Sequence, residues 1–149
     1  MKSERNFRNY LAGAALAFGT VLLTSQVLQI AYGGLGQTEL DSMMSILTDT
    51  YLAAHIAGGF LGGYLVARVR RKDYIQTGTL VAVLAYIFEF VYNVLVVRML
   101  TDIWAMLSLL IGGIVGTMFF RVRLERDKIV NLKSNETKSA LPEKASGQN

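Results

Sequence analysis

The chain contains no cysteine, and this absence excludes disulfide exchange, thioether-linked haem, cysteine-ligated metal clusters and acylation on sulfur. It contains a single histidine, His55, so no site that needs two histidine ligands can form. The sequence also has no Gly-x-Ser-x-Gly, no glycine-rich phosphate loop and no His-Glu-x-x-His. We therefore expect that the protein is not an enzyme and that it carries no metal and no cofactor.

Charged residues are scarce within four long apolar segments. Hydrophobic residues make up 52% of the 149 positions, and the mean hydropathy is +0.38. The four segments are Asn9 to Tyr32, Thr50 to Val69, Ile75 to Val97 and Ile103 to Phe120. Each is close to the ~20 residues that a helix needs to cross ~30 Å of hydrocarbon. We predict an all-α, polytopic four-helix membrane bundle over residues 1–132, followed by a disordered cytoplasmic tail over 133–149.

The first connecting loop, Gly33 to Asp49, has no lysine or arginine and carries three acidic residues. Cations instead precede the first segment, cluster in the second loop at Arg68, Arg70, Arg71 and Lys72, and follow the fourth segment; only Arg98 lies elsewhere. The positive-inside rule then places both termini in the cytoplasm, as expected for a multi-pass protein of the cytoplasmic membrane. The net charge of +4 is explained by contact with anionic lipid headgroups, and we expect no nucleic-acid partner.

The same first loop offers two possible structures. Thr38 stands three residues before Asp41, as in a helix-capping box, and an apolar stretch with two methionines follows. Residues 39–48 could form a short interfacial helix, or they could be an early start of the second span. After the fourth span, we expect the helix to continue to about Leu132.

Small residues recur at helical spacing in every span, as in GxxxG packing motifs. They let helix backbones approach closely in lipid, where no hydrophobic force drives helices together. The rows are Ala12, Ala15 and Gly19; Ala54, Gly58 and Gly62 beside His55, Gly59 and Gly63; Gly78, Ala82 and Ala85; and Ala105, Ser108, Gly112 and Gly116. Such rows favour tight packing within one bundle, and an outward-facing row would instead join copies into a homo-oligomer.

Glu89 is the one acidic residue deep within a span. It lies nine residues before Arg98, which places it ~14 Å from the membrane edge at 1.5 Å per residue. Other polar groups share its depth or lie between it and the outer surface: His55, Asn93, Gln26 and Gln29. Burying an unpaired carboxylate there would cost ~2.5 to 3.5 kcal/mol or more, so we expect Glu89 to be protonated, paired or hydrated, with His55 as its natural partner.

Two interpretations of this polar network remain open. Glu89 could be the proton- or ion-binding carboxylate of a transporter or channel, with His55 modulating it. The network could instead be an interhelical clasp that fixes helix register, which is the simpler interpretation. Tyr86 and Tyr92 flank the face that carries Glu89, whereas Tyr51 is assigned to the aromatic belt at the outer interface.

The stretch from His55 to Tyr64, with its paired glycines, is followed by Ala67-Arg68 and then by Thr77-Gly78. This pattern resembles small four-helix integral membrane proteins of bacteria and archaea that have no assigned function. The resemblance implies a four-helix membrane fold and no activity. Small multidrug transporters also have four spans and a membrane glutamate, but theirs lies in the first helix, which holds no acid here.

The sequence therefore favours a structural or accessory membrane subunit that packs through glycine-rich helix faces, with itself or within a larger membrane complex. The alternative is a small oligomeric transporter or channel, linked to protons or ions, that uses Glu89.

Overall fold

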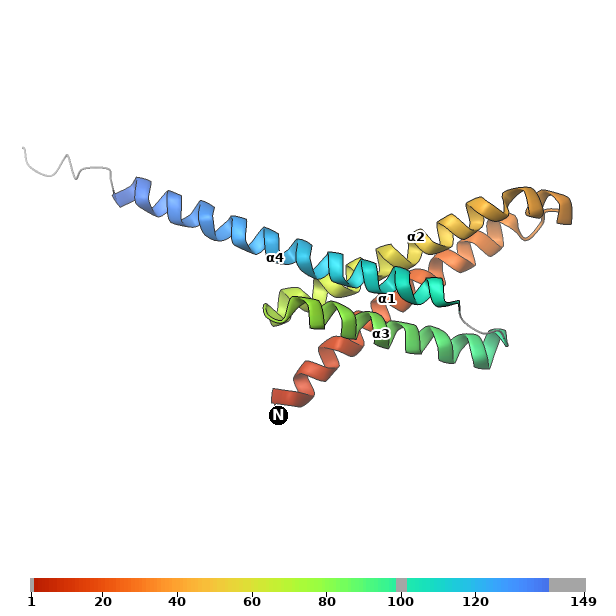
Figure 1. Cartoon of the computed structure of the whole chain (residues 1–149), viewed down its shortest axis with the longest axis horizontal. Helices are drawn as coiled ribbons and strands as arrows, with labels where there is room; N and C mark the ends of the chain where they lie inside the picture. The colour runs from red at the N-terminus through yellow and green to blue at the C-terminus, as the bar shows by residue number, and fades with distance from the viewer. Residues whose placement is uncertain (1, 99–101, 140–149) are drawn as a thin grey trace, which may run out of the picture.

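The computed structural model describes residues 2–98 and 102–139, with side chains from 7 to 98 and from 102 to 133. These ranges contain no strand. The helices are α1 (Lys2–Tyr32), α2 (Gln37–Arg70), α3 (Tyr74–Tyr92) and α4 (Ile103–Ser139), with one π-helical segment, η1 (Asn93–Val97), after α3 (Figure 1). All four long helices are apolar and long enough to cross a membrane. The predicted all-α, four-helix architecture is confirmed.

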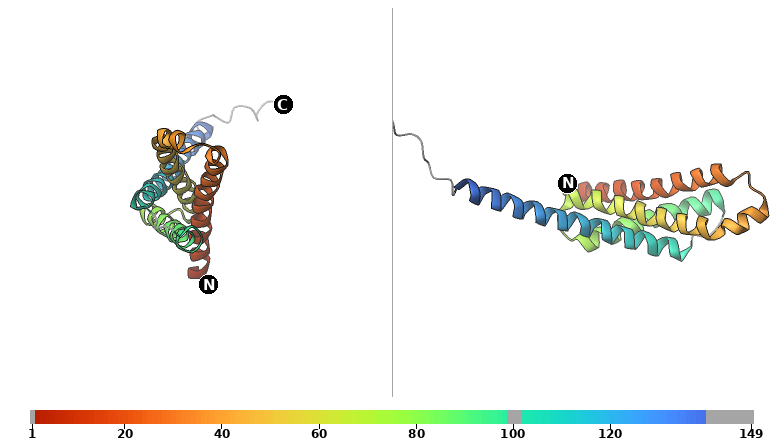
Figure 2. Two further views of the ribbon diagram at one scale, coloured as in Figure 1. Left: turned by 90° about the vertical axis from the view of Figure 1, so that its right-hand side faces the viewer. Right: turned by 90° about the horizontal axis from the view of Figure 1, so that it is seen from above.

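The four helices form one bundle in which α2 is the central element. Helix α2 packs against α1 on one side and α4 on the other, and α3 completes the bundle against α1, α4 and part of α2. Viewed from the side, the start of α1 and the far end of α4 lie at the same end of the bundle (Figure 2). We call this the basic end, since it carries the Arg71–Asp73 turn, and we call the opposite end, with the Gly33–Gly36 connection and Asp102, the acidic end.

Two neighbouring glycine rows on α2 face two different helices. A Cβ placed on Gly58 would lie 2.6 Å from the carbonyl oxygen of Ala17 on α1, and one on Gly59 would lie 2.5 Å from that of Leu109 on α4. Gly62 and Gly63 repeat this arrangement one turn later, against Gly13 of α1 and Gly113 of α4 respectively. Because real Cβ atoms do not approach that closely, any side chain at these positions would push the helices apart.

The glycines of α4 complete these contacts. A Cβ on Gly112 or Gly116 would overlap the backbone of α2 at Ile56 or Phe60. Gly113 and Gly78 face each other across α4 and α3, with a Cβ on Gly78 only 2.5 Å from the carbonyl oxygen of Gly113. The small-residue rows of α2 and α4 are therefore used between helices of one chain.

Helix α1 packs through a different face from the one predicted. Ala12 and Ala15 are exposed, and a Cβ on Gly19 would meet no atom within 4 Å. The residues of α1 that are buried against its neighbours are Tyr10, Gly13, Ala14, Ala17 and Val21. Small size alone misled the prediction, because a lipid-facing position tolerates a small residue as readily as a packed one.

The first connecting loop, which was predicted to span Gly33 to Asp49, is much shorter in the structure. Helix α2 begins at Gln37, so residues 39–48 are the early start of the second helix, and only Gly33–Gly36 connect α1 to α2. The cap is also displaced: the side chain of Glu39 accepts a hydrogen bond from the backbone N–H of Gly36 at 3.1 Å, and Thr38 is already helical. At 1.5 Å per residue, the 34-residue α2 is ~50 Å long and extends well beyond a hydrocarbon core of ~30 Å.

Helix α4 also exceeds its predicted length. It continues past Leu132 to Ser139, so its first residues fill the bundle and the remainder projects alone beyond the basic end (Figure 1). The part of the predicted tail over 140–149 lies outside the described residues.

Candidate functional site

Glu89 is buried near the middle of the bundle, with 3% of its surface exposed. It lies on the face of α3 that carries Gly78, Ala82 and Ala85, and all four residues are buried. Because the side chains of that face are small, α3 approaches its neighbours closely and its one carboxylate points into the bundle. The row of small residues that ends in Glu89 thus explains why this carboxylate lies inside the bundle.

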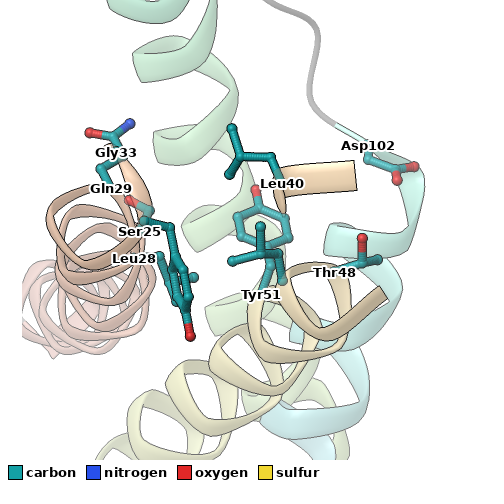
Figure 3. Close-up of a pocket in the computed structure, with 10 residues that line it drawn as sticks. Ser25, Leu28, Gln29, Gly33, Leu40, Thr48, Tyr51 and Asp102 are labelled. Carbon is teal, nitrogen blue, oxygen red and sulfur yellow. The ribbon is translucent and has the colours of Figure 1, made fainter. Parts of the chain in front are cut away.

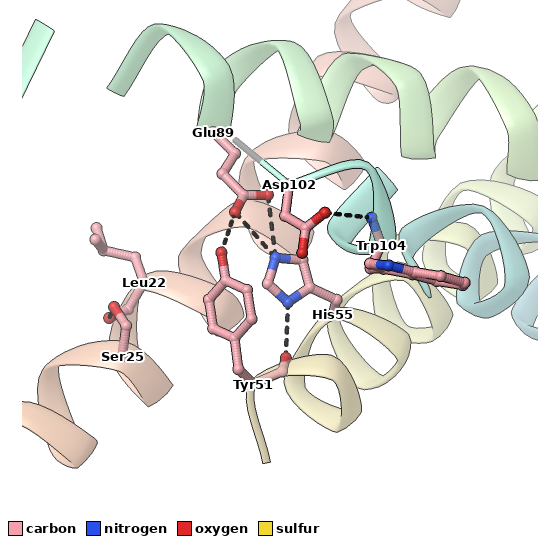
Figure 4. A network of polar contacts seen from close by, with 7 residues as sticks. All are labelled: Leu22, Ser25, Tyr51, His55, Glu89, Asp102 and Trp104. Atoms are coloured by element: carbon pink, nitrogen blue, oxygen red, sulfur yellow. Dashed lines mark hydrogen bonds and ion pairs between the residues drawn. The ribbon is translucent and has the colours of Figure 1, made fainter. Parts of the chain in front are cut away.

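His55 meets Glu89 from α2. Its Nε2 lies 3.0 Å from Oε1 and 3.1 Å from Oε2 of the carboxylate, and the imidazole is fully buried (Figure 4). His55 stands one turn before Gly59 on the face of α2 that packs against α4, which keeps the ring inside the bundle. Its other nitrogen, Nδ1, lies 2.7 Å from the backbone carbonyl oxygen of Tyr51.

Tyr51 supplies a third member of the site. Its hydroxyl donates a hydrogen bond to Oε1 of Glu89 at 2.6 Å, and its ring packs edge-on against the imidazole of His55 with centroids 4.2 Å apart. Tyr51 and His55 are four residues apart on α2, so both side chains point the same way (Figure 4). Within the described part of the chain, every buried side-chain nitrogen and oxygen has a hydrogen-bond partner.

The hydrogen bonds of His55 restrict the proton arrangements that suit the pair. A backbone carbonyl only accepts, so Nδ1 must carry a hydrogen. Nε2 can then either donate to an ionised Glu89 or accept from its protonated carboxyl group. Both states keep one shared proton between Nε2 and the carboxylate and have no net charge, which suits a buried pair.

Loss of that shared proton would change the site. The Nε2 lone pair would face an ionised carboxylate at 3.0 to 3.1 Å, and a net negative charge would remain inside the bundle. Such a charge is strongly disfavoured unless the contact opens or a cation arrives. Proton occupancy and local geometry are therefore coupled.

A cavity of about 200 Å³ reaches the carboxylate. It lies between α1, α2 and α3, and Glu89 and Tyr51 form part of its wall. The predicted site residues Asn93, Gln26 and Gln29 also line it. The structure thus brings all five predicted residues to one region: His55 and Glu89 bond directly, and the amides of the other three surround the adjoining space.

A second, larger cavity continues toward the acidic end. It has a volume of about 540 Å³ and shares Ser25, Gln29 and Tyr51 with the first (Figure 3). Asp102, which caps α4 by accepting a hydrogen bond from the N–H of Trp104 at 3.1 Å, lies at its wall. The two cavities adjoin through these shared residues, and their walls combine apolar side chains with a few polar groups between the acidic end and Glu89.

The helix that carries Glu89 changes form directly after the site. From Asn93 to Val97 the backbone is π-helical, and it ends where the N–H of Arg98 bonds to the carbonyl of Asn93 with Arg98 in the left-handed conformation. Asn93, the first residue of this terminal segment, stands four residues after Glu89 and lines the same cavity.

Searches for a matching protein-family model, a curated relative and a similar solved structure find none for this chain. The resemblance to small prokaryotic four-helix membrane proteins therefore rests on the residues of α2 and α3 alone. In the described ranges, no three His, Asp or Glu side chains gather in an arrangement that could hold a metal ion.

Sequence reasoning missed Tyr51 as a site residue, because a tyrosine near the end of a span is typical of the interfacial belt. The spacing of four residues to His55 was the available signal. Tyr92, which flanks Glu89 as expected, lines the cavity and packs its ring against Phe18 at 5.7 Å, whereas Tyr86 packs against the apolar core.

Proposed function

We propose that this protein is a small proton-linked membrane transporter or channel, in which the His55–Glu89 pair binds and releases one proton through the cavities of the acidic end. The observation that carries the proposal is the buried His55–Glu89 pair, whose side chains lie within hydrogen-bond distance of each other while the carboxylate also lines a cavity. A proton shared between the two side chains explains this short contact. A site that only fixed helix register would need the hydrogen bonds but no route to them.

The surroundings of the pair support this function. The other ionisable groups near it are Tyr51 on α2, Tyr92 on α3 and Asp102 at the start of α4, which acts electrostatically on Tyr51. Helix α1 contributes neutral polar groups, Ser25, Gln26 and Gln29. Among the described residues that line the two cavities there is no lysine or arginine, which favours the approach of a cation or proton to Glu89.

The test separates proton binding from flux. The full-length protein is reconstituted in liposomes, and infrared difference spectra are recorded as the external pH is changed. We expect a carboxyl band that responds to pH and is absent in Glu89→Gln. With an imposed membrane potential, a pH-sensitive dye inside the liposomes should report proton entry for the native protein and at least tenfold slower entry for Glu89→Gln.

Glu125→Gln is the matched control, since Glu125 is exposed and pairs with Arg121 outside the site. It should behave as the native protein in both measurements. Equal proton entry in native and Glu89→Gln liposomes, together with a carboxyl band that does not respond to pH, would overturn the proposal.

The second candidate is the structural or accessory subunit. It is supported by the complete hydrogen bonding of the pair and by the long free part of α4 beyond the basic end, which offers a surface to a partner. Native mass spectrometry of the tagged protein, extracted from its own membranes in mild detergent, distinguishes the two. A stoichiometric foreign subunit favours the accessory role, and a homo-oligomer without one favours transport.

A further inference from the structure

A third cavity lies at the basic end, away from the His55–Glu89 pair. It has a volume of about 270 Å³ and is formed by the last turns of α2, the turn that follows, and α4. Its charged wall residues are Arg68, Arg71, Arg123 and Asp127, and its other walls are Tyr64, Phe120 and Leu124. Three guanidinium groups and one carboxylate leave this pocket, which we call the arginine pocket, with an excess of two positive charges.

The backbone fixes where these guanidinium groups start. Helix α2 ends at Arg70, and Arg71 adopts the left-handed conformation, with φ of 53° and its N–H bonded to the carbonyl of Ala67 at 2.8 Å. Arg123 comes from α4 and donates a hydrogen bond to the hydroxyl of Tyr64 at 3.3 Å. Two helices and a tight turn therefore hold the three arginines around one space.

The arginines have unused binding capacity. Among the described residues, the salt bridges are His55 with Glu89 and Arg121 with Glu125, so the three guanidinium groups of the arginine pocket form none. Arginine presents a planar set of donors that matches the oxygens of a phosphate group, often through two parallel hydrogen bonds. The chemistry of the pocket thus fits a phosphate ester.

Apolar aromatic rings continue from the pocket along the surface between α2 and α4. Tyr64 stacks on Phe60 with ring centroids 6.2 Å apart, and Phe119 lies 5.8 Å from Phe60. Tyr64 also packs edge-on against Phe120 at 5.6 Å. Phe119 is 55% exposed, so this aromatic surface is open to acyl chains beside the bundle.

We propose that the arginine pocket binds the phosphate of an anionic lipid headgroup, with the acyl chains lying on the aromatic surface formed by Phe60, Tyr64 and Phe119. Basic pockets between membrane helices are recognised sites for anionic headgroups. A soluble phosphate ester would share the same arginine contacts but would leave the aromatic surface unoccupied. This site does not depend on proton binding at Glu89.

The test uses the full-length protein in mild detergent and native mass spectrometry with added phosphatidylglycerol. We expect one retained lipid per chain, and about tenfold weaker retention in Arg123→Gln, since a hydrogen bond to a charged group is worth roughly that factor. The triple variant Arg68→Gln, Arg71→Gln, Arg123→Gln should retain none. Tyr64→Phe, which keeps every charge, should weaken retention by a smaller factor.

The matched control is Arg8→Gln, Arg126→Gln, Lys128→Gln, which removes three exposed cations near the same end but outside the pocket. Retention by this control should stay within about threefold of the native protein, because the contacts of the pocket are intact. Unfolding temperatures of all variants identify any that lose the lipid through misfolding. If the triple variant misfolds, the retention measured for the single variants Tyr64→Phe and Arg123→Gln tests the proposal instead.

Two further arms identify the source of the phosphate. Phosphatidylcholine, which carries no net charge, should be retained much less than phosphatidylglycerol, and glycerol 3-phosphate should displace the lipid only at far higher concentration. Equal retention of lipid by the native protein and the pocket triple variant would overturn the proposal. Displacement by glycerol 3-phosphate at an equal concentration would replace the lipid with a soluble phosphate ester.

Discussion

The hydroxyl of Tyr51 donates to Oε1 of Glu89 at 2.6 Å, across the space between α2 and α3. The backbone carbonyl of the same tyrosine faces Nδ1 of His55 at 2.7 Å. One residue therefore controls both partners of the pair: its carbonyl sets the His55 tautomer, and its hydroxyl occupies one of the two carboxylate oxygens. Tyr51 thus orients both side chains between which the proton is shared.

Removal of the Tyr51 hydroxyl should change the hydrogen bonding of Glu89 without dismantling the pair. In Tyr51→Phe the backbone carbonyl still binds His55, but Oε1 of Glu89 loses one hydrogen-bond donor. The infrared carboxyl band of Glu89 should then shift in frequency, because the group has one hydrogen bond fewer. Tyr32→Phe, in the wall of the larger cavity, should leave the band unchanged.

Removing one partner of the buried His55–Glu89 pair should lower the unfolding free energy more than replacing both partners with apolar residues. His55→Leu leaves Glu89 without its main partner, so we expect a loss of about 3 to 5 kcal/mol in unfolding free energy if the carboxylate stays ionised. The double variant His55→Leu, Glu89→Leu removes both polar groups and should be more stable than the single variant. Denaturant unfolding in detergent checks this order, and a less stable double variant would contradict it.

Glycine at position 59 should be required for the contact between α2 and α4. Gly59→Ala places a methyl group 2.5 Å from the carbonyl oxygen of Leu109, so we expect destabilisation of about 1 to 3 kcal/mol. Gly19→Ala is the control, because its Cβ meets no atom within 4 Å and alanine favours helix. Thermal unfolding in detergent should fall for the first variant and stay level or rise for the second.

A bulky side chain in the cavities beside Glu89 should slow proton entry without changing the His55–Glu89 pair. Ser25 lines both cavities of the acidic end, so Ser25→Trp should slow proton entry in the liposome assay several-fold. Val27 is 62% exposed on the same helix, so Val27→Trp should have no effect on proton entry. Equal rates in both variants would show that protons do not use these cavities.

The cysteine-free sequence allows a direct test of orientation. Single cysteines at Asp41 and at Lys72 lie on opposite ends of the bundle, and each is the only thiol in its variant. If the positive-inside rule holds, a membrane-impermeant maleimide should label Asp41→Cys in intact cells, and should label Lys72→Cys only after permeabilisation. The reverse pattern would invert the topology.

The sequence by itself determined that the chain forms four apolar helices, because the length and polarity of each segment leave no other way to satisfy its backbone in lipid. The sequence also predicted that His55 pairs with Glu89, because an unpaired carboxylate at that depth in a membrane is costly. Periodicity could not tell which face of α1 is packed, since Ala12 and Ala14 differ only in the direction they point.

Tertiary structure decided the remainder. The role of Tyr51 and the arginine pocket depend on how α2, α3 and α4 cross, and that geometry comes from glycine contacts spread over several helices. Residues as distant as Tyr51 and Glu89, or Arg68 and Arg123, are placed by those crossings. Such long-range contacts follow from the packing of all four helices together, so no local pattern in the sequence contains them.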